Sequence, residues 1–203
     1  MANIPLSAEF RELETRYRTL RRKFLARECA AEKKDPIGFT PDVDKLAAFQ
    51  LLFHAEVEDY LERKARAKLS QIEHDISANV RVIDRLDWYA LACHFEVAIS
   101  IEVPHDRLTF QTKATEIITK GRKFVKDNNG IKSASFAVLS LLAGKRTSEI
   151  DDNLAAQLTT YGSDRGDIAH QSTVRVRTIN APSAYETSSS ALLAAIKQYF
   201  YRP

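Results

Sequence analysis

Arg165 and His170 form the residue pair of this chain whose types best suit chemistry on a phosphate. Both lie in the stretch YGSDRGDIAHQS, residues 161–172, which follows a helical pattern. A histidine titrates near neutral pH, so it can take the proton of a ribose 2′-hydroxyl or protonate a leaving oxygen. An arginine stays charged and fork-shaped, so it can hold a phosphate and stabilise transition-state charge. The pair suits cleavage of RNA without a metal ion.

The spacing of the pair carries little weight alone. With 5 histidines in 203 residues, about one arginine is expected by chance at four to six intervening residues before a histidine, and one occurs. By itself the pattern favours a structural interpretation, in which Arg165 pairs with Asp164 or Asp167 and the helix dipole stabilises His170. The surrounding string favours function, because Ile168-Ala169 would anchor the turn in the core and fix the histidine.

Helical geometry constrains how these two residues cooperate. Five residues along an unbroken helix rotate by about 140° and rise by about 7.5 Å, so Arg165 and His170 would not converge on one atom. Two arrangements are open. Either Gly166, which tolerates unusual dihedral angles, ends or distorts the helix between them, or two protomers each supply an Arg/His pair across a symmetry axis.

Composition limits the class of protein. An apolar content of 44% supports a real core, and only 6 Gly and 6 Pro favour long helices.

No apolar run reaches the roughly 18 residues of a membrane span, and the N-terminus turns acidic too early for a signal peptide. Cys29 and Cys93 match no metal or redox spacing, as expected in a reducing cytoplasm. The net charge of +3 is too small to indicate a nucleic-acid-binding protein by itself. The first helix has an excess of basic residues, and a solvent-exposed helix face explains this excess better than phosphate binding.

No metal site or cofactor is expected from the sequence. The nearest candidate ligands, His54 and Glu58, stand at helical spacing, and an ordinary hydrogen bond explains that pair better. Glu58 is by type more often a surface acid than a site residue.

The helices that position the pair are predicted from caps and apolar periodicity. Ser7 caps a first helix that ends at Asp35-Pro36-Ile37-Gly38, and Thr40-Pro41-Asp42 starts a second that ends near Ser77-Ala78-Asn79. The apolar positions expected to face the core are Phe10, Leu13, Tyr17, Leu20 and Phe24 in the first helix, and Leu46, Phe49, Phe53, Val57, Tyr60 and Leu61 in the second.

The second half of the chain is predicted in the same way. A segment over 88–99 reads as a helix whose end, EVAISIEVP, also suits a strand. Asp106 caps a helix that Asn128-Asn129-Gly130 stops, and Ser133 or Ser135 begins a short apolar one. Thr147 or Ser148 caps the helix that delivers Arg165, residues 172–183 form a loop or a short extended piece, and a last helix carries Ala191, Leu192, Ile196 and Phe200. The expected fold is an all-α bundle of about six or seven helices, in one domain over 1–203 with an N-terminal helix (1–36) and a core (40–203).

Three segments in this order resemble the HEPN superfamily, and most closely the RiboL-PSP-type HEPN proteins of bacteria. They are AFQLLFHAEVEDYL with an early acidic position, NNGIKSASFAVLSLL with a GIK-like element, and LTTYGSDRGDIAHQS with an R-x-D/E-I/V-A-H element. The resemblance spans about residues 40–200, and its late element is the specific part.

The resemblance implies a function for each matching position. Such proteins are helical bundles that form homodimers and often act as metal-independent endoribonucleases in toxin or anti-phage systems. Arg165 and His170 take the catalytic positions, Asp167 is the polar residue within the motif, and Glu58 matches the early acid that would orient the arginine. RNA is the expected substrate, with an antitoxin or a nucleotidyltransferase as a partner.

One departure leaves a second function open. Many HEPN nucleases carry a polar residue directly after the arginine, where this chain has Gly166. Members that bind without cutting also exist, so the alternative is a catalytically inactive helical module that binds RNA or a partner protein.

Overall fold

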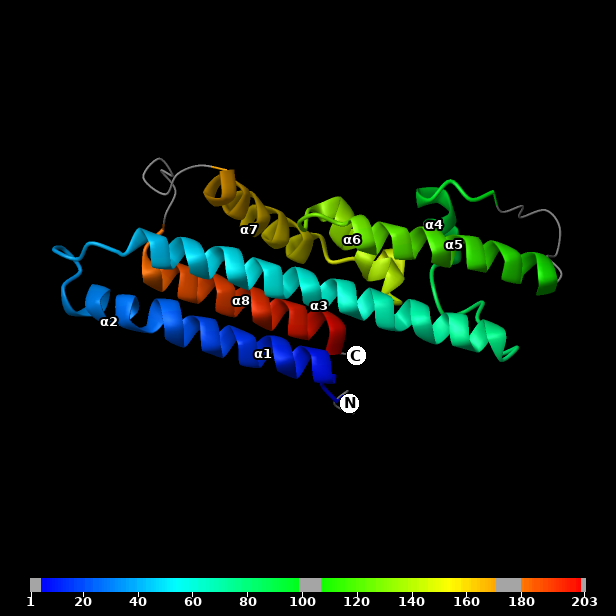
Figure 1. Cartoon of the computed structure of the whole chain (residues 1–203), viewed down its shortest axis with the longest axis horizontal. Helices are drawn as coiled ribbons and strands as arrows, with labels where there is room; N and C mark the ends of the chain where they lie inside the picture. The colour runs from blue at the N-terminus through cyan, green and yellow to red at the C-terminus, as the bar shows by residue number, and fades with distance from the viewer. Residues whose placement is uncertain (1–4, 99–106, 171–179, 202–203) are drawn as a thin grey trace. The chain divides into compact units, whose positions relative to one another are not determined.

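The structure is a computed structural model that describes residues 5–98, 107–170 and 180–201; for residues 107–108 and 164–170 it describes the backbone only. These residues form helices and no strand, which confirms the all-α prediction (Figure 1). The elements are α1 (Ala8–Leu20), the π-helical turn η1 (Arg21–Leu25), α2 (Ala26–Lys34), α3 (Val43–Ser77), α4 (Trp88–His94), α5 (Arg107–Asp127), α6 (Ser133–Leu142), the 3₁₀ turn η2 (Thr147–Glu149), α7 (Asp152–His170) and α8 (Pro182–Tyr201). Because α1, η1 and α2 are contiguous, the described ranges hold seven helices, in the expected range.

The chain, expected to be one domain, divides into two compact units. The first unit joins both ends of the sequence, residues 1–60 and 151–203, and the second comprises residues 61–150. Helix α3 contributes its first half to one unit and its second half to the other.

The first unit contains four helical stretches that alternate in direction along the chain: α1 to α2, the first half of α3, α7 and α8 (Figure 1). Its core is rich in aromatic rings. Phe53 of α3 lies at the centre, with ring centroids 5.2 Å from Tyr17 and 5.6 Å from Tyr161. At one end, the Tyr201 hydroxyl lies 2.6 Å from Ser7 Oγ and 3.2 Å from the Tyr60 hydroxyl.

The first helix follows its predicted start but changes register midway. Ser7 caps it, since its side chain accepts a hydrogen bond from the Phe10 N–H, as predicted. The predicted core position Phe24 is wrong by one residue, because Phe24 is only half-buried and Leu25 is fully buried. The π-helical turn η1 explains the shift, because each such turn inserts one extra residue into the helical repeat.

The start of α3 and the extent of α4 differ from the sequence prediction. Helix α3 begins at Val43, and Asp42 rather than Thr40 caps it, with Oδ1 3.2 Å from the Lys45 N. Helix α4 ends at His94, so the helical part of the segment over 88–99 is short. The residues that follow it up to 98 are irregular, and most of EVAISIEVP, together with Asp106, lies outside the described residues.

The second unit packs α4, α5 and α6 around the second half of α3. Helix α5 runs antiparallel to α3, because Arg122 bonds Ser70 and Glu73 while Asn128 bonds Glu62. Asn128-Asn129-Gly130 ends α5 and α6 begins at Ser133, both as predicted.

Candidate functional site

Helix α7 carries the predicted catalytic pair. It begins at Asp152, and Asp151 caps it by accepting a hydrogen bond from the Leu154 N–H at 3.0 Å. The residues predicted to cap this helix, Thr147 and Ser148, lie instead in the 3₁₀ turn η2 that precedes it, so the predicted capping residue was wrong. Leu154, Leu158 and Tyr161 are buried, as the sequence predicted.

The backbone of α7 remains helical through Gly166 to His170. The first of the two arrangements, a helix that ends between Arg165 and His170, is therefore absent. Five residues of continuous helix separate the two positions by about 140° around the axis and about 7.5 Å along it. Within one chain they stand on different faces of the same helix.

Helical steps assign each position to a row. Position 165 continues the buried row of Leu154, Leu158 and Tyr161, since the steps alternate between four and three residues. Positions 167 and 170 continue a second row, which contains Ala156, Thr160 and Ser163, all exposed. By these helical steps, positions 167 and 170 share one row of the α7 backbone and position 165 belongs to another; the side chains of residues 164–170 lie outside the described part of the structure.

Sequence reasoning missed a buried amide beside this helix. Gln50 of α3 is fully buried, and its Nε2 donates to the Tyr161 carbonyl at 3.3 Å, next to the turn that leads to Arg165. Its Oε1 has no hydrogen-bond partner among the described side chains and backbone. A buried polar atom without a partner is rare. The sequence contained one indication of this buried amide, because Gln50 is a polar residue among the apolar positions Leu46, Phe49 and Phe53.

Glu58 lies in another part of the first unit. Its Oε2 is 3.8 Å from Nδ1 of the buried His54, whose ring stacks on Tyr161 at a centroid distance of 6.3 Å. Glu58 follows Gln50 by two turns of α3, whereas Arg165 follows Tyr161 by one turn of α7, and these helices run in opposite directions (Figure 1). By helical rise the two backbone positions are about 18 Å apart along the helix axes; the Arg165 side chain lies outside the described residues, so the predicted pairing of Glu58 with Arg165 stays a prediction.

An open groove of about 950 Å³ runs along the exposed row of α7. Helix α8 forms its other wall, and Gln50 lies at its base. The residues at its surface are small or uncharged: Asn153, Ala156, Gln157, Thr160, Ala184, Ser188 and Ala191. Positions 167 and 170 continue this row along the α7 backbone.

Other catalytic chemistry finds little support in the described ranges. They contain no cluster of three or more side chains that would hold a metal ion. Burial raises the pKa of the Cys29 thiol to about 11, assisted by the nearby Glu186 carboxylate, whereas reactive cysteines have lowered pKa values. No helix in these ranges is long and apolar enough to cross a membrane.

Comparisons with known protein families, with curated proteins and with solved structures give no match to this chain.

Proposed function

We propose that this protein is a metal-independent endoribonuclease, of the toxin or anti-phage type, whose site is shared by two copies of the chain. The observation that carries the proposal is the continuity of α7. Arg165 and His170 match the specific element of the HEPN resemblance, yet one helix holds them on different faces. A second copy related by two-fold symmetry supplies the missing half of each site.

The groove between α7 and α8 supports this arrangement. Small side chains such as Ala156, Ala184 and Ala191 allow another helix to approach closely. The same face carries no charged residue among those that line the groove, so contact between two copies would bury no unpaired charge there. Asp167 and His170, which continue this face, would lie at the edge of that contact.

The proposed reaction is an internal transfer at phosphorus. The His170 imidazole takes the proton of the ribose 2′-hydroxyl, and the 2′-oxygen forms a bond to phosphorus while the bond to the 5′-oxygen breaks. A water molecule gives a proton to the leaving 5′-oxygen, and the protonated His170 then restores that proton to the solvent. Arg165 from the other copy donates to the phosphate oxygens as negative charge accumulates. In this proposal Gln50 Oε1 is a buried acceptor for one further guanidinium N–H. The products are a 2′,3′-cyclic phosphate and a 5′-hydroxyl.

We expect the purified protein to cleave single-stranded RNA in excess EDTA, because none of these steps uses a metal ion. The measurement is gel analysis of a labelled RNA, with the 3′ ends identified as cyclic phosphates. A matched RNA with 2′-O-methyl groups should resist cleavage, because it has no 2′-hydroxyl. Cleavage that requires a divalent ion, or that proceeds on the methylated RNA, contradicts the proposal.

The alternative, an inactive module that binds RNA or a partner protein, is favoured by Gly166, which stands where many HEPN nucleases have a polar residue. It predicts salt-dependent RNA binding without turnover in the same assay.

A further inference from the structure

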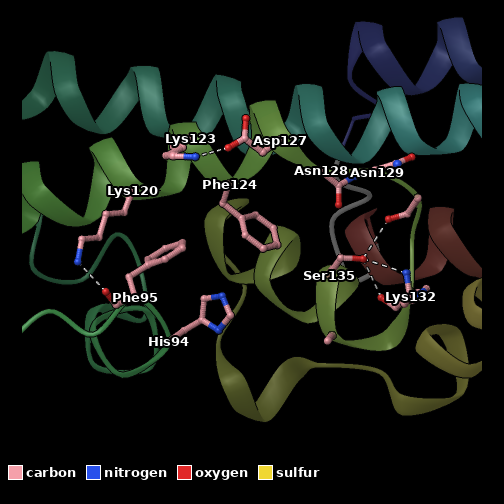
Figure 2. A pocket seen from close by; sticks show the side chains of 12 residues that line it. His94, Phe95, Lys120, Lys123, Phe124, Asp127, Asn128, Asn129, Lys132 and Ser135 are labelled. Atoms are coloured by element: carbon pink, nitrogen blue, oxygen red, sulfur yellow. Dashed lines mark hydrogen bonds and ion pairs between the residues drawn. The ribbon is translucent and has the colours of Figure 1, made fainter.

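The second unit contains a pocket of about 640 Å³ that the proposed ribonuclease site does not use (Figure 2). It is bounded by the end of α4, the last turns of α5, the loop 128–132 and the start of α6. The loop belongs to NNGIK, the middle segment that the sequence singled out. The volume lies within the range of about 300–1,000 Å³ that is usual for small-molecule sites.

Three aromatic rings form one wall of this pocket. The His94 ring centroid lies 4.9 Å from Phe95 and 5.7 Å from Phe124, and the last two are 6.1 Å apart. His94 is exposed, and both phenylalanines are only half-buried. Figure 2 shows the Phe124 ring reaching from α5 toward His94. Aromatic side chains that are not fully buried can stack on a nucleobase.

The backbone holds the rings before any ligand arrives. Lys120 Nζ donates to the Phe95 carbonyl at 2.8 Å and so ties the end of α4 to α5. The next residue, Glu96, has φ 54°, a left-handed conformation that is costly for a residue other than glycine. The Val97 N–H closes the turn onto the Ala92 carbonyl at 2.9 Å. A wall fixed in this way would lose little entropy on binding.

The opposite side of the pocket is basic. Lys132 is exposed, and no carboxylate in the described residues lies within ion-pair distance of it. Lys123 by contrast bonds the Asp127 carboxylate, which lowers the pKa of that carboxyl. Helix α6 begins directly after Lys132, so the positive end of its dipole lies on the same side. A phosphate is the group that these charges and dipoles attract.

The loop between the two sides is held open. Gly130 has φ 86°, and a Cβ placed on it would meet no atom within 4 Å. Ser135 Oγ accepts from the Lys132 N–H at 2.9 Å and lies 3.3 Å from the Gly130 carbonyl, which fixes the path of the loop (Figure 2). Asn129, exposed in this loop, offers an amide that can read the polar edge of a base.

We infer that this pocket binds a nucleotide, with its base against Phe124 and His94 and its phosphate near Lys132 and the start of α6. A free mononucleotide and one nucleotide of a single-stranded RNA present the same base and phosphate, and the experiment separates these two sources. The inference does not depend on the proposed ribonuclease activity, because none of the pocket residues lies on α7.

The test is binding by the full chain, measured by fluorescence anisotropy with a labelled 2′-O-methyl hexanucleotide, which cannot be cleaved through its 2′-oxygen. Unlabelled AMP and UMP serve as competitors. Phe124→Ala is expected to weaken binding at least about tenfold, the usual loss for one stacked base. Lys132→Glu should weaken binding several-fold. It should also make the dependence of the binding constant on salt less steep: the slope of log K against the logarithm of the salt concentration should fall in magnitude by about 0.7 for each phosphate that the protein no longer neutralises.

Lys126→Glu is the matched control, because it makes the same charge change on the last turn of α5 with a residue that does not line the pocket. Thermal unfolding checks that Phe124→Ala still folds. If Phe124→Ala does not fold, the test depends on Lys132→Glu, which changes an exposed residue. Competition by mononucleotides identifies a free nucleotide as the ligand, and binding of the hexanucleotide alone identifies RNA; both support the site. No binding of either probe, or an equal loss with Lys126→Glu, overturns it.

Discussion

His170→Ala is expected to reduce RNA cleavage by about 10²- to 10⁴-fold, the usual contribution of a general acid or base. The reason is that alanine cannot take the proton of the 2′-hydroxyl as the 2′-oxygen attacks phosphorus. The fold should be retained, because position 170 is the last residue of α7. The measurement is the initial rate of cleavage in EDTA at saturating RNA.

Arg165→Ala belongs to the same prediction and should cost about 10²- to 10³-fold, as the loss of one donor to a transition-state anion does. Arg165→Lys should remain impaired, because a lysine does not offer the planar fork. His74→Ala, at an exposed histidine of α3 in the second unit, is the control and should cleave at the normal rate. Cleavage that survives both Arg165→Ala and His170→Ala contradicts the assignment of the pair.

Phe53→Ala is expected to have the largest effect on stability, a loss of about 3–5 kcal/mol in the free energy of unfolding. Phe53 is fully buried, and its ring contacts Tyr17 from α1, Phe49 from α3 and Tyr161 from α7. Truncation leaves a cavity where three helices meet and removes aromatic pairs worth about 0.5–1.5 kcal/mol each.

Urea unfolding followed by circular dichroism measures this loss. Leu52→Ala is the matched control, because Leu52 is the preceding residue of α3 and is 41% exposed; it should change stability by less than about 0.5 kcal/mol. A similar loss for both variants would show that Phe53 is not the centre of the first unit's core.

Much of the helical layout was predictable because its signals are local. Three helix boundaries depend only on neighbouring residues, and the structure confirms them: the cap at Ser7, the break after Lys34 and the stop at Asn128-Asn129-Gly130. The shift from Phe24 to Leu25 was not predictable, since a π-helical turn leaves no mark in apolar spacing. The cap at Asp42 was missed for a different reason: Thr40 and Asp42 both suit a helix start, and packing decides between them.

The candidate site was predictable only in part. The stretch that holds Arg165 and His170 was identified from the sequence, and its helix, α7, has the predicted buried row. The sequence left a helix break at Gly166 as one of two arrangements, but a single glycine costs a helix only about 1 kcal/mol, which the packed residues before it can outweigh. The position of Glu58 depends on the direction in which α3 and α7 run, and no local pattern encodes that.

The pocket of the second unit shows the same limit. His94 and Phe124 are thirty positions apart in the sequence and touch at a centroid distance of 5.7 Å. Each residue alone looks like an ordinary helix-end or core aromatic. Only the packing of α4 against α5 brings the two rings to one wall.

The central claim, that two copies share the site, is tested most directly by mixing two inactive variants. Arg165→Ala and His170→Ala chains are co-expressed with different tags, and the cleavage rate of the mixture is compared with that of each variant alone. A mixed dimer combines the Arg165 of one copy with the His170 of the other, so one of its two sites is intact. Random pairing makes about half of the dimers mixed, so about a quarter of the normal rate should return. A mixture that stays as inactive as its two components would contradict the shared site.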